Sequence, residues 1–267
     1  MIGVQRILKI LEICYNSMMV KDERAISLIL IAETDCGKSQ LLLDYKPNTE
    51  LFRIEAYTDV TSTGLYSLVG ESEKPIIIII PDLHTIVGHR AGVSGPTINA
   101  LLSLLQDGVL KTGVGPQRQA DLAGKRAALF TALTPKSFAG KAGKWRETGF
   151  LRRLLPIYYT YSDATENAIH NYIASGKYVG DNGYSIKIKA ASPRYISISK
   201  EMSEIIKQET LITKTKLESR GFTAHHFFRT YCKSSAILSD RSAVNKDDIA
   251  VLRDLLRFTS YDEPEKV

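Results

Sequence analysis

The sequence predicts an α/β fold, in which a parallel sheet sandwiched by helices over residues 1–162 is followed by a mainly helical part over residues 163–267. Strand-like and helix-like stretches alternate through the first part, which is the pattern of parallel strands joined by helical crossovers. The run 26–32 (ISLILIA) is apolar except for Ser27, and the run 76–80 (IIIII) is apolar throughout. Such runs are typical of strands that are buried on both faces of a parallel sheet.

The first part begins with apolar side chains at helical spacing, which predict an amphipathic helix over residues 5–15. Apolar runs predict strands at 26–32, 51–57, 76–80, 126–133 and 154–161. Helices are predicted directly after Ser39, at 61–69 and at 97–106, where Pro96 suits the first turn of a helix. The three glycines of 84–95 predict a flexible loop, and GVLKTGVG at 108–115 predicts half of a hairpin.

The alternation stops near residue 162, and helical patterns dominate the second part. Helices are predicted at 163–176, 200–218, 222–239 and 247–258. Residues 184–199 are of mixed character and predict two short strands. The last five residues, EPEKV, are expected to be frayed.

The composition limits the class of protein. Hydrophobic residues make up 44% of the 267 residues and charged residues 24%, close to the average of globular domains, which excludes disordered and fibrous classes. There is no signal-peptide pattern and no apolar run of about 18 residues, the length that a membrane span needs. A cytoplasmic location away from membranes is therefore expected. Because Cys14, Cys36 and Cys232 are far apart, neither a disulfide framework nor a metal cluster is expected.

Positive charge is concentrated in one segment. The net charge is +6, and residues 107–160 alone contain ten lysines and arginines against three acidic residues. Such a basic block favours a partner that carries phosphate, either a nucleotide or a nucleic acid. The alternative is a basic surface that simply faces solvent.

The clearest motif is AETDCGKS at residues 32–39, which fits the phosphate-loop pattern with Ala32 in place of its first glycine. Successive backbone amides can point at a phosphate there, and Gly37 allows the backbone to approach closely. Lys38 would contact the outer phosphates, and the Ser39 hydroxyl would bind Mg²⁺. The predicted nucleotide-binding residues are Glu33, Thr34, Asp35, Cys36, Gly37, Lys38, Ser39 and Gln40. The alternative is an ordinary strand–loop–helix turn.

A second candidate is Asp82, which follows the isoleucine run directly after Pro81. In phosphate-loop enzymes an aspartate at the end of a neighbouring buried strand holds the Mg²⁺. Ser39 and Asp82 are therefore the predicted metal residues. The alternative is an aspartate that only closes a turn.

In the order of these motifs the chain resembles the AAA+ family of ATPases. The resemblance implies a P-loop NTPase sheet followed by a helical lid, ATP and Mg²⁺ as cofactors, and a homo-oligomeric ring, commonly a hexamer. It implies that Thr134 senses the γ-phosphate, with Thr131 as second choice, because ALFTALTP ends a strand there. It further implies an arginine finger reaching the neighbouring subunit, Arg153 first and then Arg152, and a second sensor on the lid, Arg229.

Within that family, the stretch from LLSLLQDGVLKTGVG to KRAALFTALTP resembles the hairpin and sensor strand of minichromosome maintenance helicases and related viral or mobile-element ATPases. This resemblance implies action on DNA in replication, unwinding or packaging. The basic residues that would then enter a central channel are Lys111, Lys125 and Arg126.

The sequence departs from the family directly after Asp82. The family has a glutamate there that activates the attacking water, whereas this chain has Leu83, and only the following His84 could act as a base. Slow hydrolysis is therefore expected. Two alternatives stay open: a nucleotide-gated switch or loader with little hydrolysis, and a remodeller of a protein partner. Cys36 is also expected to have a lowered thiol pKa, because it lies at a helix N-terminus.

Overall fold

A computed structural model describes residues 2–43, 45–47, 50–88, 91–105, 125–176, 184–187, 190, 192–217 and 221–267. Its main feature is a six-stranded sheet in the order β3-β4-β5-β1-β6-β8, in which every pairing is parallel. These strands are β1 (Leu28–Ile31), β3 (Arg53–Ala56), β4 (Ile76–Ile80), β5 (Ala127–Leu133), β6 (Leu155–Thr160) and β8 (Glu265–Lys266). The predicted α/β class and the parallel sheet are confirmed.

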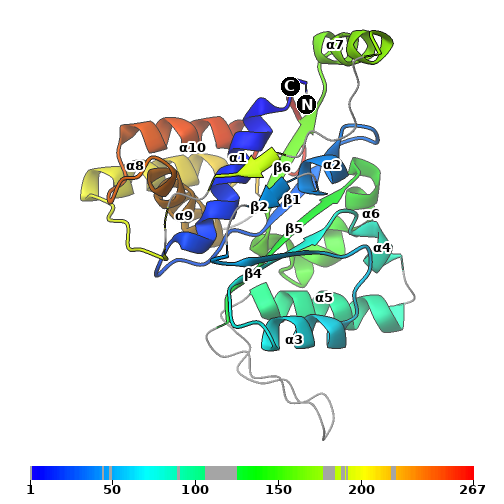
Figure 1. Cartoon of the computed structure of the whole chain (residues 1–267), viewed down its shortest axis with the longest axis horizontal. Helices are drawn as coiled ribbons and strands as arrows, with labels where there is room; N and C mark the ends of the chain where they lie inside the picture. Colours follow the sequence, from blue (N-terminus) through cyan, green and yellow to red (C-terminus); the bar gives the residue numbers. More distant parts are fainter. Residues whose placement is uncertain are drawn as a thin grey trace, which may run out of the picture.

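Helices cover both faces of the sheet (Figure 1). Alternate side chains of β1 enter two separate cores, Leu28 and Leu30 on one face and Ile29 and Ile31 on the other. The first core contains α1 (Gln5–Asn16), η1 (Ser17–Met19), α2 (Lys38–Leu43), α8 (Lys200–Thr213), α9 (Phe222–Leu238) and α10 (Lys246–Phe258). The second contains α3 (Ser62–Gly70), α4 (His84–Val87), α5 (Ala91–Leu105), α6 (Pro135–Glu147) and η2 (Leu151–Arg153). Burial on both faces explains why β1 and β4 are apolar throughout.

The helices α8, α9 and α10 pack on one another, and α9 also packs on α1. The start of α10 is fixed by a capping box, in which Asn245 and Asp248 bond each other's backbone amides. The carboxylate of Asp248 is fully buried and accepts two hydrogen bonds of 2.7 Å from the guanidinium of Arg241. The helices α8, α9 and α10 belong to the same hydrophobic core as α1. The boundary between two domains near residue 162 therefore stays a prediction.

Three predicted boundaries are wrong. The segment 84–95, predicted as a loop, contains α4 and the start of α5. The helix predicted at 97–106 begins at Ala91, because Pro96 removes one backbone donor without preventing a preceding helical turn. The C-terminal residues, predicted to be frayed, form β8, where the backbone amide of Val267 donates to the carbonyl of Thr160 at 2.9 Å.

Some elements were not predicted at all. The helix α6 follows β5 directly, with Thr134 as its N-cap. A separate two-stranded parallel pair joins β2 (Tyr45–Pro47) to β7 (Tyr184–Ile186), so the described residues of 184–199 contain one of the two strands expected there. In contrast, the helix predicted over 163–176 is present as α7 (Asp163–Ala174). The hairpin expected at 108–115 lies outside the described residues.

Candidate functional site

The phosphate-loop motif lies at the carboxyl end of β1, in the middle of the sheet. Asp35 and Gly37 have left-handed backbone conformations, with φ of +64° and +69°. The hydroxyl of Tyr159 in β6 donates a 2.7 Å hydrogen bond to the carbonyl of Cys36. The neighbouring strand therefore holds the loop in its curved form.

Lys38 lies across this loop. Its ammonium donates a hydrogen bond to the carbonyl of Glu33 at 2.5 Å. Burial lowers the pKa of the Lys38 ammonium, while nearby negative charge, including that of Asp82, opposes this shift. Asp82, 44 residues away in sequence, therefore lies within electrostatic range of Lys38. A phosphate bound in the loop could take the place of the Glu33 carbonyl as the partner of Lys38.

Asp82 follows β4 and is exposed. Its Oδ1 accepts a 2.9 Å hydrogen bond from the backbone amide of His84. Leu83 is fully buried in the second core, and its amide donates to the carbonyl of Ala132 at 3.0 Å. The position after Asp82 is therefore part of the apolar core, and the His84 side chain remains the nearest candidate base along the chain.

The two candidate threonine sensors occupy different places. Thr134 lies at the carboxyl end of β5, where its hydroxyl caps α6 by accepting from the Ser137 amide at 3.3 Å. Thr131 is fully buried inside the sheet, and its hydroxyl donates to the carbonyl of Ile80 at 2.7 Å. Of the two, only Thr134 lies at the same edge of the sheet as Lys38 and Asp82.

A cavity of about 590 Å³ adjoins the phosphate loop. One wall is the loop itself, from Glu33 to Gly37 with Gln40 and Leu41. The other residues that line it are Ile2, Val4, Thr160, Tyr161, Glu166, Ile169, His170, Tyr172 and Ile173. None of these nine was among the candidates from sequence. The lining residues that follow β6 could have been predicted from the order of the strands alone. The carboxyl ends of parallel strands meet at one edge of a sheet, so the segment after β6 lies near the loop after β1.

The thiol of Cys36 does not have the lowered pKa that the sequence predicts. Only 6% of the residue is exposed, and burial raises the pKa of its thiol rather than lowering it. The effect of burial on the thiol pKa exceeds that of a hydrogen bond with the backbone of Tyr161 and of the charge of Lys38, which act in the opposite direction.

We expect the native protein to react slowly with a thiol reagent at neutral pH. Cys14 and Cys232 are fully buried, and burial raises the pKa of both thiols, so all three cysteines are protected. Release of the coloured thiolate from Ellman's reagent measures this, with the same protein in urea as the fully reactive control. One rapidly reacting thiol in the native protein would contradict the packing around Cys36.

Replacement of Gly37 by alanine is expected to cost about 1–2 kcal/mol of stability, because its backbone is left-handed. The added methyl group would also lie 3.3 Å from the hydroxyl of Tyr161, so the loop would have to shift. Gly140→Ala on α6 is the matched control, since nothing lies within 4 Å of its added methyl group. That control is expected to gain about 0.5–1 kcal/mol. Thermal unfolding of both variants decides the point, and equal effects would contradict it.

The predicted arginines lie at the other edge of the sheet. Arg152 and Arg153 belong to η2, which directly precedes β6, whereas the phosphate loop follows β1. Arg153 is half-buried and donates to the carbonyl of Gly149 at 2.7 Å, while Arg152 is exposed. The structure thus brings neither arginine to the phosphate loop of its own chain.

Arg229 is also far from the loop. Its guanidinium lies 3.4 Å from the carboxylate of Glu23, which precedes β1 and accepts a 2.6 Å hydrogen bond from Lys233. Glu23 lies before the strand and the phosphate loop lies after it, so the predicted sensor contact is not formed in this arrangement. Sequence reasoning missed Glu23 as the partner of Arg229.

The candidate nucleic-acid residues are held by the fold. Lys125 donates to the carbonyl of Ser72 at 2.7 Å, and Arg126 donates to the carbonyl of Glu23 at 2.7 Å. Burial lowers the pKa of Arg126. In this arrangement carbonyl groups of the same chain bind both side chains, and a role of Lys125 and Arg126 in a channel stays a prediction. Lys111 lies outside the described residues.

Within the described ranges, no group of three or more histidine, cysteine or acidic side chains could hold a metal ion. The donors available at the loop edge are the hydroxyl of Ser39 and the carboxylate of Asp82, both exposed. Two oxygen donors suit Mg²⁺, which keeps water and phosphate oxygens as its remaining ligands. In the same part of the chain no helix has the length and apolar character needed to cross a membrane.

Neither a family model nor a curated protein matches the sequence. Among solved structures, the chain is similar to a full-length MCM homolog from Methanopyrus kandleri, with a TM-score of 0.56 and 13% sequence identity. The chain has a P-loop NTPase-like fold. The match covers 97% of this chain but 56% of the other, so the chain spans little more than half of that protein's length. At this identity the likeness concerns the fold.

Proposed function

We propose that the chain is an AAA+ ATPase that binds ATP with Mg²⁺ and couples the state of the nucleotide to action on DNA. The observation that carries this proposal is the position of Lys38 and Asp82 at the carboxyl edge of the sheet, within electrostatic range of each other and next to a loop that lines a cavity of about 590 Å³. A cavity of this size is within the range that takes a nucleotide-sized ligand. The fold likeness to an MCM homolog supports it.

The orientation of ATP follows from the chemistry of the two sides of the loop. Apolar and aromatic groups such as Ile169, Tyr172 and Ile173 line the cavity and suit the base and ribose. The triphosphate then runs over the loop toward Lys38 and Ser39. Its outer end reaches Asp82, which holds the Mg²⁺ with Ser39, and Thr134.

Hydrolysis is slow in this proposal, because the fully buried Leu83 offers no base for the attacking water. The same observation favours a second candidate function, a nucleotide-gated switch that binds ATP and turns it over very little. Lys38, Ser39 and Asp82 have the same role in both.

Action on DNA rests on the resemblance of the sequence and on positive charge. With Lys125 and Arg126 held by carbonyls, the exposed lysines of α6 are the better candidates for phosphate contacts. They are Lys136, Lys141 and Lys144. Binding through such contacts weakens steeply as salt rises, because counterions are released.

The decisive experiment measures ATP binding and turnover with and without single- and double-stranded DNA, for the wild-type chain and for Lys38→Ala. Turnover that DNA stimulates and Lys38→Ala abolishes supports the DNA-dependent ATPase. Tight binding with no turnover above the variant leaves the switch. Absence of ATP binding by the wild-type chain contradicts both.

A further inference from the structure

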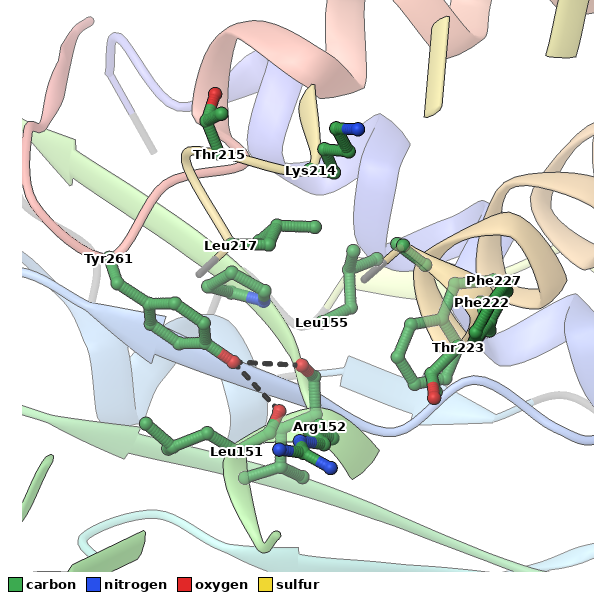
Figure 2. A pocket seen from close by; sticks show the side chains of 14 residues that line it. Leu151, Arg152, Leu155, Lys214, Thr215, Leu217, Phe222, Thr223, Phe227 and Tyr261 are labelled. Carbon is green, nitrogen blue, oxygen red and sulfur yellow. Dashed lines mark hydrogen bonds between the residues drawn. The ribbon is translucent and has the colours of Figure 1, made fainter. Parts of the chain in front are cut away.

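A second pocket, of about 410 Å³, lies at the amino edge of the sheet, opposite the phosphate loop (Figure 2). Its base is formed by Leu151, just before β6, by Leu155, the first residue of β6, and by Tyr261. The Tyr261 hydroxyl donates to the carbonyl of Leu151 at 2.8 Å and lies 3.2 Å from that of Leu154 (Figure 2). The base of the pocket is therefore held in place by the fold itself.

The walls of this pocket are largely apolar. Phe222 and Phe227 come from α9, and Leu217 comes from the segment after α8 (Figure 2). Leu154 and Pro156 add further apolar surface next to the base. A pocket of this volume and lining can bury the apolar groups of a ligand.

Positive charge lies on two sides of the apolar surface. Arg152 and Lys214 line the pocket, and in Figure 2 they stand on opposite sides of Leu155 and Leu217. Lys216 follows close by, and all three cations are exposed. Within the part of the chain that the structure describes, none of the three forms an ion pair, and no acidic residue lines the pocket. The occupant that fits this charge has acidic groups on both sides of an apolar centre.

Exposed apolar side chains also gather beside the pocket, where the end of α8 meets the start of α9. Phe222 is 75% exposed, Ile212 71% and Leu211 44%, and these are three of the six exposed large hydrophobic residues of the described part. The two helix ends are adjacent, since a methyl group added to Gly221 would lie 3.3 Å from the side chain of Thr210. Apolar side chains gathered in this way are typical of a surface that binds another protein.

We propose that this pocket binds an extended segment of a partner protein in which acidic residues flank apolar ones. The apolar side chains of the segment fill the pocket over Leu155 and pack on Phe222. Carboxylates on one side pair with Arg152, and those on the other side pair with Lys214 or Lys216. A small molecule with a single acidic group would leave the cations of one side without a partner.

Peptide binding to the full chain, followed by fluorescence polarisation, tests the proposal. The probe is a library of fluorescein-labelled hexapeptides in which two apolar residues lie between two pairs of aspartate or glutamate. The apolar residues are drawn from leucine, isoleucine, valine, methionine and phenylalanine. The control library has asparagine or glutamine in place of the acidic residues.

We expect saturable binding of acidic peptides and binding at least about fivefold weaker by the matching amide peptides, because several ion pairs are lost together. Absence of saturable binding by every acidic peptide, up to the solubility limit, would overturn the proposal. Equal affinity of the acidic and the amide peptides would overturn it as well.

Two variants show whether the peptide lies in this pocket. Lys214→Glu and Phe222→Ala are each expected to weaken binding of the tightest acidic peptide by roughly 5- to 10-fold. Both side chains are exposed, so the variants should fold, which thermal unfolding checks. Lys246→Glu, at the exposed start of α10, is the matched control and is expected to leave the affinity unchanged. Wild-type affinity in both pocket variants would mean that the peptide binds elsewhere and would overturn the proposal.

Light scattering without peptide shows whether a second copy of the chain occupies the pocket instead. Phe222→Ala is expected to leave the mass of the protein in solution unchanged. A lower mass for this variant would mean that another copy covers the pocket, and would overturn the proposal.

The proposal does not depend on the nucleotide function, because the residues that line this pocket are separate from the phosphate loop and its cavity. Lys38→Ala is therefore expected to bind the peptide as the wild type does. A chain that binds the peptide but not ATP would contradict the nucleotide function alone. A chain that binds ATP but none of the acidic peptides would contradict this proposal alone.

Discussion

Replacement of Lys38 by alanine is expected to weaken ATP binding by roughly 10- to 100-fold. The ammonium lies over the phosphate loop, next to the carbonyl of Glu33 and within electrostatic range of Asp82. Loss of hydrogen bonds to a charged group costs about 1.5–3 kcal/mol, which corresponds to that range of affinity. Titration calorimetry with ATP and Mg²⁺ measures the change.

The matched control is Lys141→Ala, which removes an exposed lysine of α6 and should leave the affinity within twofold. Thermal unfolding of both variants checks that the fold is intact, because Lys38 is not part of either hydrophobic core. Equal affinities of wild type and Lys38→Ala would contradict the assignment of the loop. A parallel loss in both lysine variants would point to general electrostatic attraction instead.

Replacement of Glu23 by alanine is expected to have the largest effect on stability, about 3–5 kcal/mol. The side chains of Glu23 and Lys233 are each only 8% exposed, and their charged atoms lie 2.6 Å apart. Without the carboxylate, the Lys233 ammonium would stay buried without its partner, and Arg229 would lose its contact as well. Urea unfolding of the variant measures the loss.

Two variants make this prediction specific. Glu204→Ala removes a carboxylate from a pair of similar geometry, 3.0 Å from Lys207, but both side chains are more than half exposed. Its expected cost is much smaller than that of Glu23→Ala, because solvent screens an exposed ion pair. The double variant Glu23→Leu/Lys233→Met should recover most of the stability, because apolar residues can replace a buried ion pair. A cost for Glu23→Ala as small as that for Glu204→Ala would contradict the burial of the pair.

Much of the fold could be predicted because its signals are local. The isoleucines of β4 and the apolar residues of β1 are consecutive in sequence, as burial on both faces of a sheet requires. The phosphate loop could be predicted for the same reason, since its glycine, lysine and serine are adjacent in sequence. The parallel sheet then makes it reasonable that Asp82 and Lys38 meet at one edge.

The rest depends on contacts between distant residues, which no local pattern reports. Arg229 pairs with a residue 206 positions away in sequence, so its place opposite the phosphate loop could not be predicted from α9 alone. Arg126 belongs to a basic block, yet carbonyl groups from residues 17 and 23 take up its guanidinium. The cavity beside the loop is assembled from the N-terminal segment and α7, and sequence alone does not place these side by side.

The position of β1 has a consequence for how the chain acquires its structure. Leu28 pairs with Phe130 on one side and with Leu155 on the other, so the central strand gains both neighbours only after most of the chain exists. The bond from Tyr159 that holds the loop comes later still. The phosphate loop is therefore synthesised before the strands on which its shape depends. Until β5 and β6 are made, both edges of the apolar strand β1 lack their strand partners. Pairing between residues so distant in sequence is slow, and exposed apolar strands are prone to aggregate in the meantime.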